Sequence, residues 1–197
     1  MLILFKKKKI VQILQTLWTT YDPHWDNVLF MLSSDTVPGM SKTLLEDFSI
    51  NSWPVTNNGS VPVTNTQSKF GSTSLSFYGA DSTAAGARYL TAQVPQAQKI
   101  TTEDFTVEGW FYVNRYVRTT NEYCFSLFGD YKDEWRAQAG FMITVNSDGS
   151  VRAYVPGWPY RAELFNSGAI VDAGDRSGKW NHIAVSRQGV YIRVFIN

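Results

Sequence analysis

The stretch KWNHIAVSRQGVYIRVFIN, residues 179–197, contains two apolar runs joined by a short polar turn. Apolar residues recur with a period of two in each run, which is the period of a β-strand with one buried face. Gln188 and Gly189 stand between the runs, and a short connection containing Gly is typical of a tight hairpin. The stretch therefore predicts an antiparallel β-hairpin.

The same pattern of short strands and turns extends over most of the chain. From Asp22 onward, short runs rich in β-branched and aromatic residues are separated by Gly, Asn, Asp, Ser and Pro. A second hairpin turn is predicted at residues 147–149. Besides the two final runs, the predicted strands are residues 27–32, 74–79, 104–114, 123–129, 139–146 and 150–155. Because no long segment in this part has helical periodicity, we expect an all-β fold, an antiparallel two-sheet jelly-roll sandwich.

Alternation also assigns side chains to faces. In DFTVEGWFYV, residues 104–113, one face is apolar and is expected to face the core: Phe105, Val107, Gly109, Phe111 and Val113. The other face carries Thr106, Glu108, Trp110 and Tyr112. Near residue 75 we expect Gly71 to adopt a positive φ in a turn, with Leu75 and Phe77 facing the core.

The first 21 residues differ from the rest. The basic run of MLILFKKKK is followed by apolar residues at helical spacing, which predict a short amphipathic helix: Ile10, Ile13, Leu14, Leu17 and Trp18. The run also resembles a secretory signal, but Gln12 and Gln15 interrupt it and no small-residue cleavage site follows. It is too short and polar to span a bilayer. We expect residues 1–21 to form a flexible or loosely docked arm, with attachment to a partner as the alternative, and residues 22–197 to form one domain.

Composition limits the partners. The net charge is +1, from 18 basic and 17 acidic residues, so no overall field favours nucleic acid or an anionic membrane. Aromatic residues reach 15%, including 7 Trp, so some rings are expected at the surface. Cys124 is the single cysteine, which excludes an intrachain disulfide and a cysteine-based zinc site.

Six segments in order carry a resemblance to a known family: DPHWDNVLFML, LLEDFS, QSKFGSTSLSFYGADS, RYLTA, DFTVEGWFYV and KWNHIAVSRQGVYIRVFIN. Together they resemble the laminin G-like jelly rolls of the concanavalin A-like lectin and glucanase superfamily, in the form common in bacteriophage structural proteins and bacterial surface proteins. The resemblance covers about residues 22–197. Since relatives continue beyond the last of these strands, it implies a C-terminally incomplete domain. Residues 190–197 are then expected at an exposed edge, or covered by the arm or by another chain.

Enzymatic activity is not expected. Glycoside hydrolysis needs two carboxyl groups across the scissile bond, and the laminarinase-like relatives carry theirs at alternating positions of one strand. The corresponding strand here has Glu108, with Glu103 and Asp104 at its start, and no Glu-x-Asp-x-x-Glu arrangement exists. A Gly-x-Ser-x-Gly elbow and a P-loop are also absent from the sequence. His182 and His24 are interpreted as a packed strand residue and a turn residue.

Two aromatic loops are the candidate ligand-binding sites. Trp158 and Tyr160 lie in PGWPYR, whose prolines stiffen the backbone, and Tyr131 and Trp135 lie in GDYKDEWR. Rings of this kind pack on the C–H faces of sugars. The alternative is that they cover the sandwich edge or contact a neighbouring subunit.

No ion is required, and calcium is the alternative, because the resemblance implies an early Asp that Asp47 matches, with Asp81 as its companion. No cofactor is otherwise expected. The resemblance implies a virion or extracellular, cell-surface protein that binds glycans or neighbouring protein subunits, with self-association as a further expectation. A carbohydrate-binding module of a larger secreted protein is the alternative, and a glycoside hydrolase is the third.

Overall fold

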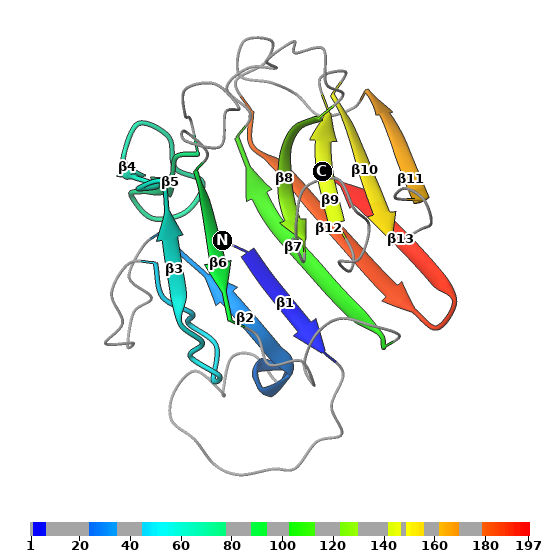
Figure 1. Cartoon of the computed structure of the whole chain (residues 1–197), viewed down its shortest axis with the longest axis horizontal. Helices are drawn as coiled ribbons and strands as arrows, with labels where there is room; N and C mark the ends of the chain where they lie inside the picture. Colours follow the sequence, from blue (N-terminus) through cyan, green and yellow to red (C-terminus); the bar gives the residue numbers. More distant parts are fainter. Residues whose placement is uncertain are drawn as a thin grey trace. The chain divides into compact units, whose positions relative to one another are not determined.

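The computed structural model describes residues 2–6, 24–34, 45–77, 88–93, 103–112, 123–129, 142–146, 149–155, 162–169 and 179–197. One short 3-10 helix, η1 (Trp25–Asn27), occurs in these ranges beside the strands (Figure 1). The strands are β1 (Leu2–Lys6), β2 (Val28–Leu32), β3 (Val55–Asn58), β4 (Val63–Thr64), β5 (Ser74–Leu75), β6 (Tyr89–Ala92), β7 (Phe105–Phe111), β8 (Tyr123–Gly129), β9 (Met142–Asn146), β10 (Ser150–Val155), β11 (Ala162–Ala169), β12 (Asn181–Gln188) and β13 (Tyr191–Ile196). The predicted all-β class is confirmed.

The five-stranded sheet has the order β13-β12-β7-β1-β2. Strand β1 pairs antiparallel with β2, where Leu2 lies opposite Leu32, and with β7, where Leu2 lies opposite Gly109. Figure 1 shows this blue strand between its two neighbours. Residues 2–6 were expected in a flexible or loosely docked arm, and the structure instead makes them a sheet strand. A short continuous apolar run such as LILF is compatible with a β-strand as well as with an arm. The helix predicted from Ile10 to Trp18 lies outside the described residues.

The four-stranded sheet has the order β11-β10-β9-β8. Strands β9 and β10 pair antiparallel, with Val145 opposite Val151, so the hairpin predicted around residues 147–149 is confirmed. The final hairpin is confirmed too, because β12 and β13 are neighbours in the five-stranded sheet. Two further pairs, β3 with β6 and β4 with β5, form separate two-stranded antiparallel sheets.

The chain divides into two compact units. The first comprises residues 1–99, 103–110 and 185–193, and the second comprises residues 100–102, 111–184 and 194–197. Buried apolar side chains of the first unit are Val28, Leu29, Phe30, Met31, Leu32, Phe48, Val61, Phe105, Val107 and Val185. Those of the second are Ile143, Val145, Val151, Ala153, Ile183 and Ala184.

The predicted faces of β7 are largely confirmed. Phe105 and Val107 are buried, whereas Thr106, Glu108 and Trp110 on the opposite face are half-buried. Gly71 has the expected positive φ, at 61°. The prediction for Phe77 was wrong, because its side chain is 51% exposed. Strand β5 ends at Leu75, so the alternation on which that prediction relied stops before Phe77.

Candidate functional site

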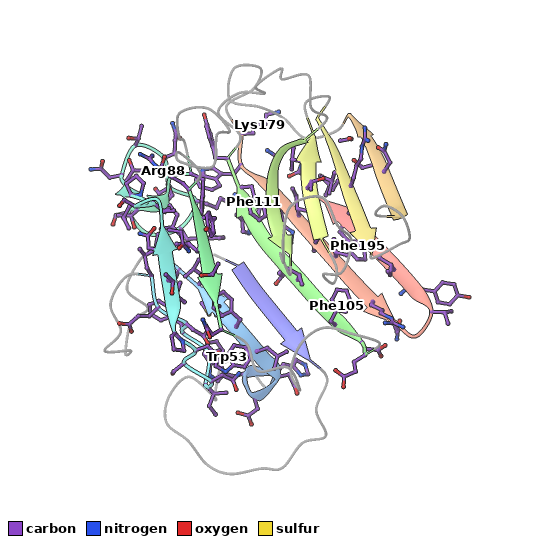
Figure 2. The ribbon with its side chains drawn as sticks, viewed as in Figure 1. Trp53, Arg88, Phe105, Phe111, Lys179 and Phe195 are labelled. Carbon is purple, nitrogen blue, oxygen red and sulfur yellow. The ribbon has the colours of Figure 1, made fainter. Side chains whose placement is uncertain are left out.

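Asp47 is buried, with 1% of its surface exposed, and its carboxylate organises the turn that follows it. Oδ1 accepts hydrogen bonds from the backbone N–H groups of Met31 (3.0 Å) and Ser49 (2.8 Å). Oδ2 accepts them from the Ser49 hydroxyl (2.8 Å) and the Trp53 N–H (3.0 Å). A carboxylate has about four acceptor positions, so these four donors occupy its capacity. Asp47 thus ties the turn that ends at Trp53, labelled in Figure 2, to strand β2.

The side-chain amide of Asn51 also attaches this turn to strand β2. The Asn51 side chain donates from Nδ2 to the Leu29 carbonyl at 2.9 Å, and the Ser49 hydroxyl lies 3.0 Å from that carbonyl. Within the described ranges, no group of three or more His, Cys, Asp or Glu side chains is placed to hold a metal ion. Asp81 lies outside these ranges, so the calcium site stays a prediction. The visible role of Asp47 is structural.

The four predicted ligand-binding residues lie outside the described residues: Trp158, Tyr160, Tyr131 and Trp135. Their role as a ligand platform therefore stays a prediction. A ring within the described ranges can take that role only where one of its faces is open. Such a face, with polar groups beside it, is what a sugar ring requires.

Trp110 on β7 does not present an open face. The Lys69 ammonium lies over its ring at 3.9 Å from the centroid, and the Phe70 ring packs against it edge-on, with centroids 5.9 Å apart. A cation over the face of an indole is attracted by the ring quadrupole. Lys69 and Phe70 therefore act as a cover that leaves the indole half-buried, although Phe70 itself is 52% exposed.

In the second unit, the Trp180 ring also contacts a neighbouring aromatic ring. It packs edge-on against Tyr112 with centroids 5.6 Å apart, and both side chains are half-buried. His182 lies two residues further along the chain, half-buried, and its backbone N–H donates to the Asn197 side chain at 3.1 Å. This arrangement agrees with the interpretation of His182 as a packed strand residue.

The outer face of the β3–β6 pair has a different character. In the register of this pair, Thr56 lies opposite Thr91 and Asn58 lies opposite Tyr89. Since side chains alternate along a strand, these four share one face, which we call the Tyr89 face. Tyr89 is 51% exposed, and Thr56 and Thr91 are also exposed. The Tyr89 face thus offers one phenol ring, one amide and two hydroxyls, and it contains no charged side chain.

The Tyr89 face is held in place by its own hydrogen bonds. Asn58 donates from Nδ2 to the Thr91 hydroxyl at 3.3 Å, which links the two strands across the face. Behind it, Asn57 both donates to the Val61 carbonyl (3.0 Å) and accepts from the Val61 N–H (2.7 Å). This clamp closes the turn after β3, where Gly59 has a φ of 70°. Hydrogen bonds of this kind restrict side chains before a ligand binds, which lowers the entropy cost of binding.

Sequence reasoning did not select the Tyr89 face. The signals available were Asn-Gly at residues 58–59, which is typical of a turn, and the alternation within RYLTA. Neither signal shows that residues 56 and 91 are neighbours, because that pairing depends on the tertiary register.

The acidic residues near β7 have identifiable surroundings. Asp104 Oδ1 accepts a hydrogen bond from the Gly189 N–H at 2.7 Å, so this carboxylate supports the β12–β13 turn. Glu103 is exposed and Glu108 is half-buried on the outer face of β7.

In the described part of the chain, no helix is both long and apolar enough to cross a membrane.

The described residues form an all-β structure with antiparallel sheets, consistent with the predicted jelly-roll β-sandwich. The family comparison agrees: a laminin G-type family model, described as concanavalin A-like lectin/glucanases superfamily, matches residues 84–197. This match spans more than half of the chain, and the chain belongs to that superfamily. Comparisons with curated proteins and with solved structures each found no match.

Proposed function

We propose that this protein is a non-catalytic adhesion module that binds neutral glycans. The observation that carries the proposal is the Tyr89 face, where an exposed ring lies beside an amide and two hydroxyls on a rigid strand pair. The ring would pack on the C–H face of a sugar, and the polar groups would orient its hydroxyls. The absence of charge on this face favours a neutral sugar over an acidic one.

The aromatic loops supply a second surface for the same ligand class. In this proposal Trp158 with Tyr160, and Tyr131 with Trp135, are further rings for glycan stacking, as the sequence predicts. In this proposal binding needs no cofactor, and Asp47 keeps the structural role that its hydrogen bonds to protein groups indicate. Calcium held by Asp81 with Asp47 is the alternative.

We place the protein on a virion or cell surface, as a fibre or decoration component that also contacts neighbouring subunits. The superfamily match and the near-neutral, Trp-rich composition support this setting. The alternative is a carbohydrate-binding module of a larger secreted protein, and a glycoside hydrolase is the third candidate. The genes that flank the coding sequence test the setting: capsid or tail genes support a virion component, and secreted-enzyme genes support the alternative.

The decisive experiment is glycan-array screening followed by calorimetric titration with the best neutral oligosaccharide. Tyr89→Ala is expected to weaken binding about tenfold, because the stacking ring is lost. Phe77→Ala is the matched control, since Phe77 has the same exposed fraction of 51% but lies outside the Tyr89 face. Equal affinities of the two variants would contradict the role of Tyr89, and cleavage of the oligosaccharide would contradict a non-catalytic module.

A separate prediction concerns the aromatic loop and the ion. Trp158→Ala is expected to weaken glycan binding, because a stacking ring is lost, and EDTA is expected to leave the affinity of the native chain unchanged. Titrations in EDTA and in excess Ca²⁺ measure the second point. A loss of affinity in EDTA that Ca²⁺ restores would assign a calcium site and contradict cofactor-free binding.

A further inference from the structure

Strand β13 presents an exposed row of side chains that the proposed glycan binding does not use. In the order β13-β12-β7-β1-β2, its hydrogen-bonded neighbour in the described part is β12, on one side. Tyr191 is 65% exposed and Phe195, labelled in Figure 2, is 51% exposed, with exposed Arg193 between them. Proteins usually protect such edges with Pro, Lys or inward-pointing charges. β13 contains no Pro and no Lys, and its single charge points outward.

The backbone of β13 is also placed for further pairing. The Asn197 N–H donates to the His182 carbonyl at 3.0 Å, so the peptide groups of odd-numbered residues point toward β12. Because these directions alternate along an antiparallel strand, the N–H and C=O groups of the even-numbered residues point to the other edge: Ile192, Val194 and Ile196.

We propose that a second copy of this chain pairs with β13 through that edge, antiparallel and related by a two-fold axis. Such an interface is isologous, so one strand must supply both halves of every contact. β13 meets this condition, because it contains a cation and two aromatic rings on the same face. Arg193 already lies over the Tyr191 ring of its own strand, with the guanidinium carbon 5.5 Å from the centroid.

The register follows from charge. Outward peptide groups must face outward peptide groups, which a two-fold axis at any residue of the strand satisfies, and the axes near the middle of the strand are at Ile192, Arg193 and Val194. An axis at Arg193 would place two guanidinium groups directly opposite each other, which is unfavourable. The axes at Ile192 and Val194 place Arg193 opposite an aromatic ring of the second copy, Tyr191 or Phe195, where a cation–π contact forms. The interface is therefore centred on Ile192 or Val194.

The self-complementary pattern selects a second copy over a strand from another protein. A strand from another protein would need an acidic residue opposite Arg193 to bind more strongly than the cation–π contact does. A second copy of β13 already supplies the aromatic rings for that contact. The inference does not depend on glycan binding, which a monomer could perform through the Tyr89 face.

Sedimentation equilibrium of Val194→Pro and Val194→Ala tests the proposal. Both variants shorten the same side chain, but only Pro removes the outward N–H, which bonds to no group of β12. The native chain and Val194→Ala are expected to dimerise, and Val194→Pro is expected to weaken the dimer at least about tenfold. A native chain that stays monomeric at about 1 mM, or a folded Val194→Pro variant that dimerises like Val194→Ala, would overturn the proposal.

Disulfide trapping gives an answer even where the Pro variant does not fold. In a Cys124→Ser background, Ile192→Cys or Val194→Cys places two thiols across the two-fold axis, at a Cα separation of about 5.5 Å that a disulfide spans. We expect one of these variants to form a covalent dimer on non-reducing gels, while Phe77→Cys on another surface does not. Equal trapping of Phe77→Cys, or no trapping at either β13 position, would overturn the proposal.

Discussion

At the scale of single residues, Asp47 shows how a buried carboxyl group can be tolerated. A buried polar group is costly unless hydrogen-bond partners replace the lost solvent. Backbone groups of Met31, Ser49 and Trp53 and the Ser49 hydroxyl supply those donors. Three of the four donors come from the turn that Asp47 begins, so folding of that turn and burial of the carboxylate support each other.

Asp47→Ala is therefore expected to destabilise the protein by about 3 kcal/mol, because it leaves several buried donors without an acceptor. Asp26→Ala is the control, since Asp26 is exposed in η1, and its effect should stay within about 0.5 kcal/mol. Urea denaturation measures both free energies of unfolding. Equal effects of the two substitutions would show that the Asp47 network contributes little.

At the scale of elements, the β12–β13 hairpin depends on the conformation of its turn. Gly189 has a φ of 59°, its N–H donates to Asp104 at 2.7 Å, and its carbonyl accepts from Arg187 Nε at 2.9 Å. A Cβ built on Gly189 would meet nothing within 4 Å, so steric crowding with neighbours does not restrict this position. The backbone conformation alone favours glycine there.

Gly189→Ala is expected to lower the free energy of unfolding by about 1–2 kcal/mol, the cost of a left-handed conformation for a residue with a Cβ. Gly189→Asn should cost less, because Asn adopts this region more readily than Ala. Thermal unfolding of the two variants measures the difference. An Ala variant as stable as the native chain would mean that the turn relaxes to another conformation.

At the scale of the whole molecule, strand β1 joins the start of the chain to segments distant in sequence. It pairs with β2 on one side and with β7 on the other, so two antiparallel ladders depend on five residues. Without β1, both neighbours would have unpaired peptide groups along one edge, which promotes aggregation.

Deletion of residues 1–6 is accordingly expected to lower the melting temperature by several degrees, by about 4 °C or more, and to increase light scattering on heating. Replacement of the three lysines at residues 7–9 by Ser is the control, because these positions lie beyond the end of β1. A deletion variant that melts and scatters like the native chain would favour the loosely docked arm that the sequence predicts.

Much of the fold was predictable because local patterns were strong. Alternation in residues 104–113 identified the buried face of β7, and Gly-containing turns located the β9–β10 and β12–β13 hairpins. The candidate site was less predictable. Tyr89 and Thr56 are more than thirty residues apart in sequence, and no local pattern reports that they share a face.

The amino-acid sequence by itself determined the positions of many strands, the tight turns and the superfamily, because periodicity and turn chemistry act over a few residues. The tertiary structure decided which strands are neighbours. It brought Leu2–Lys6 into the sheet, joined the Asp47 carboxylate to the Met31 N–H of β2 and assembled the Tyr89 face. These features depend on hydrogen bonds between segments far apart in the chain, and such pairings form only where the whole fold brings the segments together.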